Sequence, residues 1–357
     1  MHDVAIAGGG PAGLAAAIRA AQRGFRTVVF ERGGAAPDKA CGEGLMPSGA
    51  RELDRLGVAI APVQRAPFRG IRYVQEDGIV LEARFRCGEH GVGIRRSTLA
   101  QALRDRAIEC GAEIRRGSVT AARSLADCVE VQADAGTIHA RLLIAADGLH
   151  SALRRAAGLE APRARAPMRY GIRRHFALPP WTDFVEVYWS AGLEAYVTPV
   201  GPRSVNVAFL RDRESADDFE GLLARFPSLR EKIGAAAAET DIRGAGPLLQ
   251  RVRARWSARL ALIGDAAGYV DAITGQGLSL AFAAASILTD SLPDDLSGDL
   301  GPALRRYDAG VRARWLRYAW PAHALVALSR RPALRRAALR GIARIPGAFG
   351  ALVRLVE

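Results

Sequence analysis

Five residues near the start of the chain have the types and spacing of a phosphate-binding turn. Gly8, Gly10 and Gly13 form the pattern G-x-G-x-x-G, and Pro11 and Ala12 lie between the last two glycines. Glycine at these positions permits a tight turn, lets the backbone approach a pyrophosphate and lets a helix pack closely on a strand. The N-terminus of that helix presents free N–H groups and a positive dipole end. The pattern therefore indicates the binding of a dinucleotide cofactor.

The elements that must position this turn are also indicated. Residues 4–7 read as an apolar strand, residues 14–22 as an alanine-rich helix and residues 27–30 as a second strand. Glu31 and Arg32 come next, and Glu31 stands eighteen residues after the last of the three glycines. An acidic side chain at this distance binds the ribose hydroxyls of an adenosine. This part of the chain fits NAD as well as FAD.

Two later motifs separate FAD from NAD. Residues 147–154 follow the pattern D-G-x-x-S-x-x-R, beginning at Asp147, and Gly264 is followed by Asp265. These motifs resemble those of flavoproteins with the para-hydroxybenzoate hydroxylase fold. The resemblance extends from residue 3 to about residue 310, with four motifs in the family's order. It implies FAD as the cofactor.

The resemblance also implies roles for individual residues. Asp265 is expected to hydrogen-bond the ribityl chain, and a helix over residues 278–288 is expected to point its positive end at the flavin, where it stabilises the reduced ring. Arg96, at the start of a helix ending at residue 107, is expected near the flavin phosphates or the ribityl chain, and the backbone of Val119 near the adenine. The expected FAD-binding residues are Gly8, Gly10, Pro11, Ala12, Gly13, Glu31, Arg32, Arg96, Val119, Asp147, Gly264, Asp265, Gly275 and Gly277.

The expected fold class is α/β, with a Rossmann-like FAD-binding domain of the GR2/PHBH type, an inserted β-sheet substrate domain and a helical C-terminus. Alternating segments between residues 184 and 210 predict strands of a sheet that carries the substrate. The family pattern implies that the FAD-binding domain is discontinuous. The expected boundaries are 1–67, 95–165 and 256–300 for the FAD-binding domain, 68–94 and 166–255 for the substrate sheet, and 301–357 for a basic helical region.

The segment from residue 39 to residue 47 is expected to pass close to the flavin ring, and Cys41 and Glu43 are the candidate catalytic residues. Its C-G-x-G pattern, which begins at Cys41, is similar to that of geranylgeranyl reductases. Its G-E-x-x-x-P pattern is similar to that of flavin halogenases, but residues 194–199 lack both tryptophans of the halogenase W-x-W-x-I-P stretch. Cys41 also fits a small buried hydrophobic residue with no chemical role.

Three functions remain open at this stage. The favoured one is a monooxygenase that uses NAD(P)H and O2 to hydroxylate a lipophilic aromatic small molecule, because the D-G segment serves both FAD and NADPH in many relatives. The alternative is a reductase of carbon–carbon double bonds similar to geranylgeranyl reductases, which residues 268–274 resemble more closely. A third is a flavin-binding protein at the membrane surface without catalytic activity. The expected substrate is a small apolar organic molecule.

The net charge of +13 comes mainly from the end of the chain, where residues 305–357 carry twelve arginines against Asp308 and Glu357. Aromatic side chains on which bases could stack do not alternate with these charges, so nucleic acid is not expected as a partner. Leu334, Ala338, Ile342 and Ile345 share one predicted helical face opposite the arginines. That helix fits either contact with an anionic membrane surface or packing on the protein with a solvated basic face.

Further features define the class of protein. The four cysteines have no C-x-x-C spacing, so neither a metal site nor a disulfide framework is expected. The first strand begins near residue 3 and no apolar run reaches about 20 residues, so the expected location is the cytoplasm, with possible membrane association. The six histidines are dispersed and indicate no catalytic arrangement, although His175 and Tyr196 fall in the predicted substrate sheet.

Overall fold

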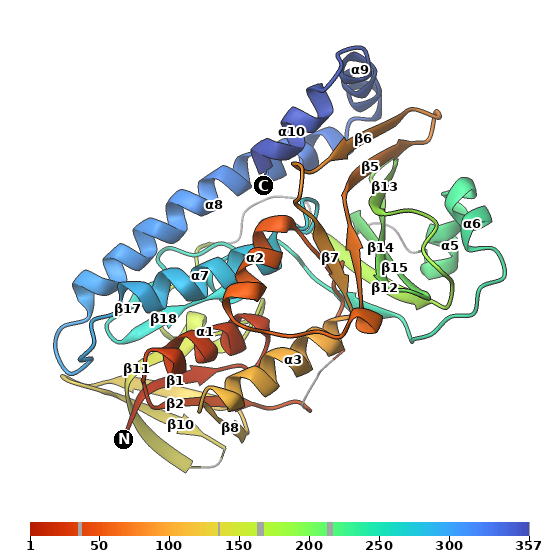
Figure 1. Cartoon of the computed structure of the whole chain (residues 1–357). Helices are drawn as coiled ribbons and strands as arrows, with labels where there is room; N and C mark the ends of the chain where they lie inside the picture. Colours follow the sequence, from red (N-terminus) through yellow and green to blue (C-terminus); the bar gives the residue numbers. More distant parts are fainter. Residues whose placement is uncertain (35–37, 135, 163–167, 213–216, 357) are drawn as a thin grey trace.

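The computed structural model describes residues 1–34, 38–134, 136–162, 168–212 and 217–356, and two large sheets dominate it (Figure 1). The first sheet has the strand order β17-β18-β11-β1-β2-β8, and β10 and β9 extend it antiparallel from β11. Strands β8, β2, β1, β11 and β18 are parallel. The bounds are β1 His2–Ala7, β2 Thr27–Glu31, β8 Glu113–Arg116, β9 Val119–Ser124, β10 Val129–Ala133, β11 Gly136–Ala145, β17 Trp256–Ser257 and β18 Leu260–Leu262.

Both faces of this first sheet are buried. Val4 and Ile6 of β1 face a core shared with the helices, whereas Ala5 and Ala7 face a core shared with β10 and the short helix α4 (Ala152–Ala156). Alternate residues of a strand point to opposite faces, so one apolar strand contributes to both cores. The helices of the first core include α1 (Pro11–Gln22), α3 (Arg96–Glu109), α7 (Gly277–Ser291) and α8 (Gly301–Ser329).

The second sheet has seven strands in the order β16-β12-β15-β14-β13-β5-β6. Helices α5 (Phe219–Ala224) and α6 (Pro227–Ile233) pack on one of its faces. A small sheet of β3 (Gly44–Leu45), β7 (Gly91–Ile94) and β4 (Arg65–Phe68) lies against β14. Helix α2 (Pro47–Arg55) follows β3 in the chain. The bounds of the seven strands are β5 Gly70–Gln75, β6 Val80–Arg84, β12 Arg169–Phe176, β13 Phe184–Ser190, β14 Leu193–Gly201, β15 Ser204–Asp212 and β16 Arg243–Ala245.

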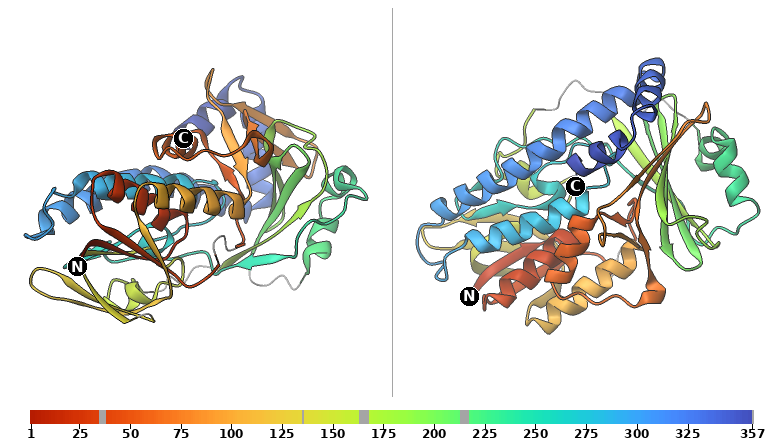
Figure 2. Two further views of the ribbon diagram at one scale, coloured as in Figure 1. Left: turned by 60° about the horizontal axis from the view of Figure 1, so that its bottom comes forward. Right: turned by 45° about the horizontal axis from the view of Figure 1, so that its top comes forward.

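The C-terminal region is helical and joins the two halves of the molecule. The long helix α8 lies along α7, and α10 (Ala348–Val356) packs against β6 of the second sheet, with α9 (Pro332–Ala343) between them in the chain (Figure 2). The face predicted for the tail helix is wrong. Leu334 and Ile345 are exposed, and the buried residues of α9 are Arg335 and Leu339. Among the described residues, no helix combines the length and the apolar character needed to cross a bilayer.

The expected α/β fold is confirmed, and most element boundaries differ from the expectation by a few residues. Helix α1 begins at Pro11 because proline suits the first helical position. Helix α6 ends at Ile233, where Gly234 has a φ of 56°. The two-sheet arrangement places the segment after β2 between the parallel sheet and the seven-stranded sheet.

Candidate functional site

The glycine turn after β1 has no room for side chains. Gly8 has a φ of 109°, and a Cβ atom there would lie 2.4 Å from the carbonyl oxygen of Ala146. A Cβ atom on Gly13 would lie 1.9 Å from the carbonyl oxygen of Gly8. Helix α1 then begins at Pro11 with Gly10 as its N-cap, and no side chain caps the first turn. The turn therefore leaves the N–H groups of the first helical turn open to an anion.

The carboxylate of Glu31 is held at the end of β2. Its two oxygens accept hydrogen bonds from the backbone N–H groups of Gly9 and Gly33, each at 2.7 Å. The N–H of Gly117 donates to the carbonyl oxygen of Glu31 at 3.0 Å, which brings the start of β9 at Val119 beside this carboxylate. Arg32 is exposed next to it. The position expected for the ribose, at Glu31, and the position expected for the adenine, at Val119, are thus joined by one backbone hydrogen bond.

The D-G segment is tied to the second flavin motif by one buried arginine. Arg154, in α4, is fully buried and donates to the carbonyl oxygens of Leu149 at 3.0 Å and Ala266 at 3.3 Å. Asp147 accepts a hydrogen bond from the N–H of Leu153 at 3.3 Å through Oδ2. Its Oδ1 atom is buried and has no hydrogen-bond partner within the described residues. A buried acceptor without a donor indicates a ligand that supplies one.

The second flavin motif packs directly on the glycine turn. Gly264 has a φ of 60°, and a Cβ atom there would lie 2.7 Å from the Cβ of Ala12. Asp265 follows in a short 3-10 helix, η2 (Gly264–Ala267), where the residue is exposed and Arg96 and Lys39 are the nearby positive charges. After Gly275, which has a φ of 65°, α7 begins at Gly277 without a side-chain cap on its first turn. The N-termini of α1 and α7, neither of which has a side-chain cap, thus lie on either side of the space expected to hold the cofactor.

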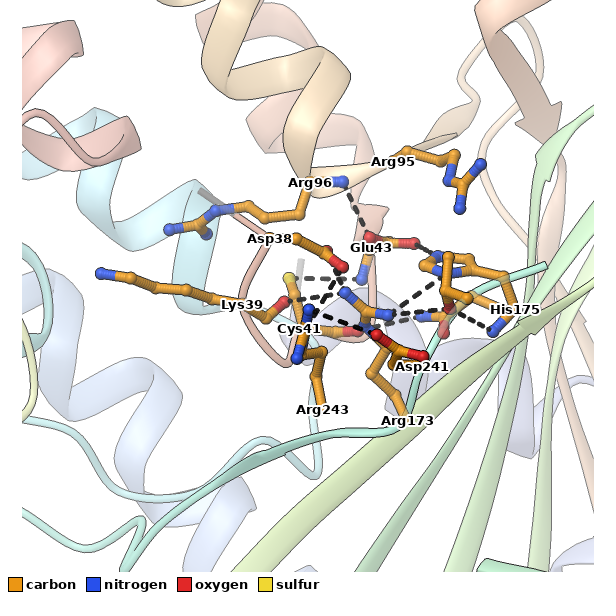
Figure 3. A network of polar contacts seen from close by, with 12 residues as sticks. Asp38, Lys39, Cys41, Glu43, Arg95, Arg96, Arg173, His175, Asp241 and Arg243 are labelled. Carbon is orange, nitrogen blue, oxygen red and sulfur yellow. Dashed lines mark hydrogen bonds and ion pairs between the residues drawn. The ribbon is translucent and has the colours of Figure 1, made fainter. Parts of the chain in front are cut away.

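Arg96 connects this space to the segment that carries Cys41 and Glu43. Its guanidinium lies 3.9 Å from the position that a Cβ atom of Gly10 would take. Its backbone N–H donates to Oε1 of Glu43 at 2.7 Å. Figure 3 shows the side chains of Arg96 and Lys39 extending in one direction, away from His175. The positive charges lie on the cofactor side of the segment.

Glu43 forms a buried contact with His175 on the other side. Its Oε2 atom lies 2.5 Å from Nε2 of His175, and both side chains are buried (Figure 3). Nδ1 of His175 lies 3.1 Å from the hydroxyl of Thr240 and 3.3 Å from Nη1 of Arg173. Glu43 has a φ of 60°, a left-handed conformation that a non-glycine residue adopts only when its surroundings hold it.

Cys41 lies at the start of the same turn. The backbone N–H of Glu43 donates to its Sγ at 3.4 Å, and the amide of Asn206 in β15 donates to its carbonyl oxygen at 2.9 Å. Part of the residue is exposed, but burial of the thiol raises its pKa, and the nearby Arg96 offsets only part of that shift. Arg173 forms an ion pair with Asp38 and holds the beginning of the segment against the second sheet. The thiol therefore stays protonated at neutral pH.

Comparison with known proteins identifies the family. The FAD binding domain family matches residues 1–314. The chain belongs to this family. Menaquinone reductase of Mycolicibacterium smegmatis is 31% identical over 300 residues, which cover 77% of this chain and 72% of that protein. The 3-amino-4-hydroxybenzoate 2-monooxygenase PtnB3 of Streptomyces platensis is 29% identical over 330 residues, or 85% of this chain and 83% of that one.

A solved structure agrees with this assignment at the level of the fold. The flavin-dependent brominase Bmp2 superposes with a TM-score of 0.86, covering 99% of this chain and 93% of that chain, at 18% sequence identity. At this identity the likeness shows the shared fold alone. The reaction of this chain must therefore be argued from its own residues.

The residues present fit FAD. The open first turn of α1 suits the pyrophosphate, the Glu31 carboxylate the ribose, and the open first turn of α7 the flavin ring. The unpartnered Oδ1 atom of Asp147 provides a further acceptor for the cofactor. Arg32, which the sequence also predicts to bind FAD, is exposed beside Glu31.

His175 and Tyr196 lie in the second sheet, as the sequence predicts, whereas the contacts of Asn206 and Arg169 were not predicted. His175 and Asn206 form a cross-strand pair between β12 and β15, and both contact the segment that carries Cys41. Arg169, six residues before His175 in β12, is buried in ion pairs with Glu194 and Asp271. Tyr196 donates to the carbonyl oxygen of Ile273 at 3.0 Å, so it holds the loop before α7. The available signal was charge at alternate positions of an otherwise apolar strand.

Proposed function

We propose that this FAD-dependent oxidoreductase reduces an activated or isoprenoid carbon–carbon double bond in a lipophilic substrate, with NAD(P)H as the electron donor. The observation that carries the proposal is the protonated thiol of Cys41, held between the cofactor cradle and the buried pair of Glu43 and His175. A site that saturates a double bond needs a proton donor fixed beside the substrate, and the Cys41 thiol is such a donor.

Saturation of a double bond takes a hydride at one carbon and a proton at the other. FAD, when reduced, supplies the hydride. The Cys41 thiol supplies the proton, because its raised pKa keeps it protonated until a strongly basic carbon develops nearby. The thiolate that remains accepts a hydrogen bond from the backbone N–H of Glu43 and lies near the positive charge of Arg96. It then regains its proton from water.

Glu43 and His175 act in this scheme as positioning residues. The carboxylate of Glu43 accepts the N–H of Arg96 and contacts His175, so it fixes the turn that presents the thiol. Because the turn has a φ of 60° at Glu43, loss of either contact allows it to relax to a more common conformation. The distance between thiol and cradle then changes, and proton transfer slows.

The relatives support this reading in part. One relative is named as a menaquinone reductase, and the C-G-x-G pattern at Cys41 resembles geranylgeranyl reductases. The similarity to PtnB3, together with the D-G segment at Asp147, favours hydroxylation as the second candidate. The proposal thus departs from the reaction favoured by the sequence, because the thiol and its supports became visible only in the fold.

The test is a single turnover without O2. Reduced holoprotein is mixed with menaquinone, and the rate of flavin oxidation is followed by absorbance for the natural chain, Cys41→Ala and Cys87→Ala. We expect Cys41→Ala to slow the reaction by about 100-fold or more, the contribution of a positioned acid. Cys87 is exposed and provides the matched control. Equal rates in all three proteins would remove Cys41 from the reaction.

A further inference from the structure

The outward face of α8 carries an unusual combination of exposed apolar and basic side chains. Leu316 is 56% exposed and Trp320 is 78% exposed. They lie four residues apart, on one side of the helix, in a line that continues to the exposed Ala313 and Ala324. Figure 1 shows α8 along one edge of the molecule, and the exposure of Leu316 and Trp320 shows that this line of residues faces solvent.

Arginines flank this apolar line on both sides. At about 100° per residue, Arg312 falls on one flank of Leu316 and Trp320, and Arg317 falls on the other. Both arginines are exposed, and within the described part of the chain neither has a carboxylate within ion-pair distance. The one acidic residue of α8, Asp308, lies one helical turn before Arg312 on the same flank, but it is partly buried and pairs with Arg255 at 3.1 Å. Its negative charge is therefore offset by Arg255, and it forms no ion pair with Arg312.

We propose that the outer α8 face, defined by Arg312, Leu316, Arg317 and Trp320, docks on an anionic lipid bilayer. A narrow apolar strip between two basic flanks has the form of a helix that lies in the membrane interface. Tryptophan is favoured at that depth because its ring is apolar and its N–H is polar. A second copy of the chain is a poorer occupant, since a two-fold contact would bring like charges together.

The face lies close to the cofactor cradle. Helix α8 packs along α7, and a groove between them is lined by Tyr269, Gly277, Leu280 and Trp315. Tyr318 of α8 donates to the carbonyl oxygen of Asp271, in the loop before α7, at 2.6 Å. A bilayer under α8 is thus adjacent to the elements that form the site. The inference does not depend on which reaction the site performs.

The experiment is flotation of the holoprotein with vesicles of phosphatidylcholine alone or mixed with phosphatidylglycerol. We expect binding to the mixed vesicles, weakened by salt, and little binding to phosphatidylcholine alone. Arg312→Gln with Arg317→Gln should weaken binding by about 25-fold, since each arginine near an anionic surface contributes about fivefold. Leu316→Glu with Trp320→Glu should weaken it by more than about tenfold.

Matched controls separate this face from the general charge of the protein. Arg203→Gln with Arg230→Gln removes two exposed arginines of the second sheet and α6, and Ile108→Glu replaces a residue of α3 that is 51% exposed. These controls should bind as the natural chain does. The emission of Trp320, obtained as the difference between the natural chain and Trp320→Phe, should shift to the blue on mixed vesicles.

Four results would overturn the inference. They are no binding to the mixed vesicles at low salt, unchanged binding in both face variants, equal losses in the controls, and a dimer without lipid that Leu316→Glu with Trp320→Glu converts to a monomer. The last result would make the face an interface between copies. Because the substituted side chains are exposed, the thermal unfolding midpoint of each variant should stay near that of the natural chain.

Discussion

The Oε2 atom of Glu43 lies 2.5 Å from Nε2 of His175, across 132 positions of sequence. The pair joins the segment after β2 to strand β12 of the second sheet, and both side chains are buried. Through its other oxygen, Glu43 accepts the N–H of Arg96 at the start of α3. One carboxylate therefore connects the cofactor cradle, the Cys41 turn and the second sheet.

His175→Phe should destabilise the holoprotein. It leaves one buried oxygen of Glu43 without a partner, and the expected loss is about 3 kcal/mol in the free energy of unfolding. The control is His139→Phe, whose ring is exposed near Glu130 and should change the free energy by less than about 0.5 kcal/mol. Urea titration of both variants measures the difference. Equal effects would show that the contact with Glu43 has no special energetic role.

The Cys41 thiol should resist alkylation at mildly alkaline pH. Burial raises its pKa, so the reactive thiolate forms only as the pH rises above the range usual for a cysteine. The iodoacetamide reaction of Cys41, followed by mass spectrometry of the peptides, should be slower at neutral pH than that of the exposed Cys87 and should still accelerate above the pH range usual for a cysteine. A Cys41 thiol that alkylates as fast as Cys87 at neutral pH would contradict its role as a proton donor.

Much of the cofactor cradle followed from the sequence, because its residues act locally. Gly8, Gly13 and Glu31 serve a strand, turn and helix that adjoin in the chain, and their spacing is set by that unit. Helix α7 begins at Gly277, one residue before the predicted start at residue 278, for the same reason. FAD and the α/β fold were both predicted correctly.

The contacts between sheets could not be predicted in this way. His175 and Asn206 are brought together by the register of β12 and β15, which one sequence does not specify. The tail helix was assigned the wrong face because Arg335 is fully buried, where it donates to Gln75 and to the carbonyl oxygen of Ser190. Burial of an arginine depends on acceptors from distant strands, and periodicity alone assigns it to solvent.

Glu194 should make part of the stability depend on pH. Burial raises its pKa to about 7 from 4.5, although Arg169 lies against it. Between pH 4.5 and about 7, the Glu194 carboxyl binds a proton more readily in the folded chain than in the unfolded chain. The contribution of Glu194 to the free energy of unfolding therefore falls as the pH rises through this range. Glu194→Gln should remove that part of the pH dependence in urea titrations.

Glu186→Gln provides a control of opposite sign. Burial raises the pKa of Glu186, but hydrogen bonds from Tyr188, Arg72 and Trp181 outweigh it and hold the pKa below its usual value. Its contribution to stability is present above the ordinary carboxyl range and lost as the pH falls. The same pH trend in both variants would contradict the two assignments.

Gly13→Ala should abolish FAD binding. The new Cβ would lie 1.9 Å from the carbonyl oxygen of Gly8, so the turn and the start of α1 must separate. Gly34→Ala is the matched control, because no atom lies within 4 Å of its Cβ position. The ratio of bound flavin to protein after purification measures the effect. Normal flavin content in Gly13→Ala would show that the turn does not bind the cofactor.

The most direct test of the proposed reaction is the mass of its product. Reduced holoprotein is incubated with menaquinone or a geranylgeranyl lipid, once without O2 and once with isotopically labelled O2, and the lipid is analysed by mass spectrometry. We predict a product that gains hydrogen in pairs, forms without O2 and contains no labelled oxygen. Incorporation of labelled oxygen, or the absence of any conversion without O2, would contradict the account.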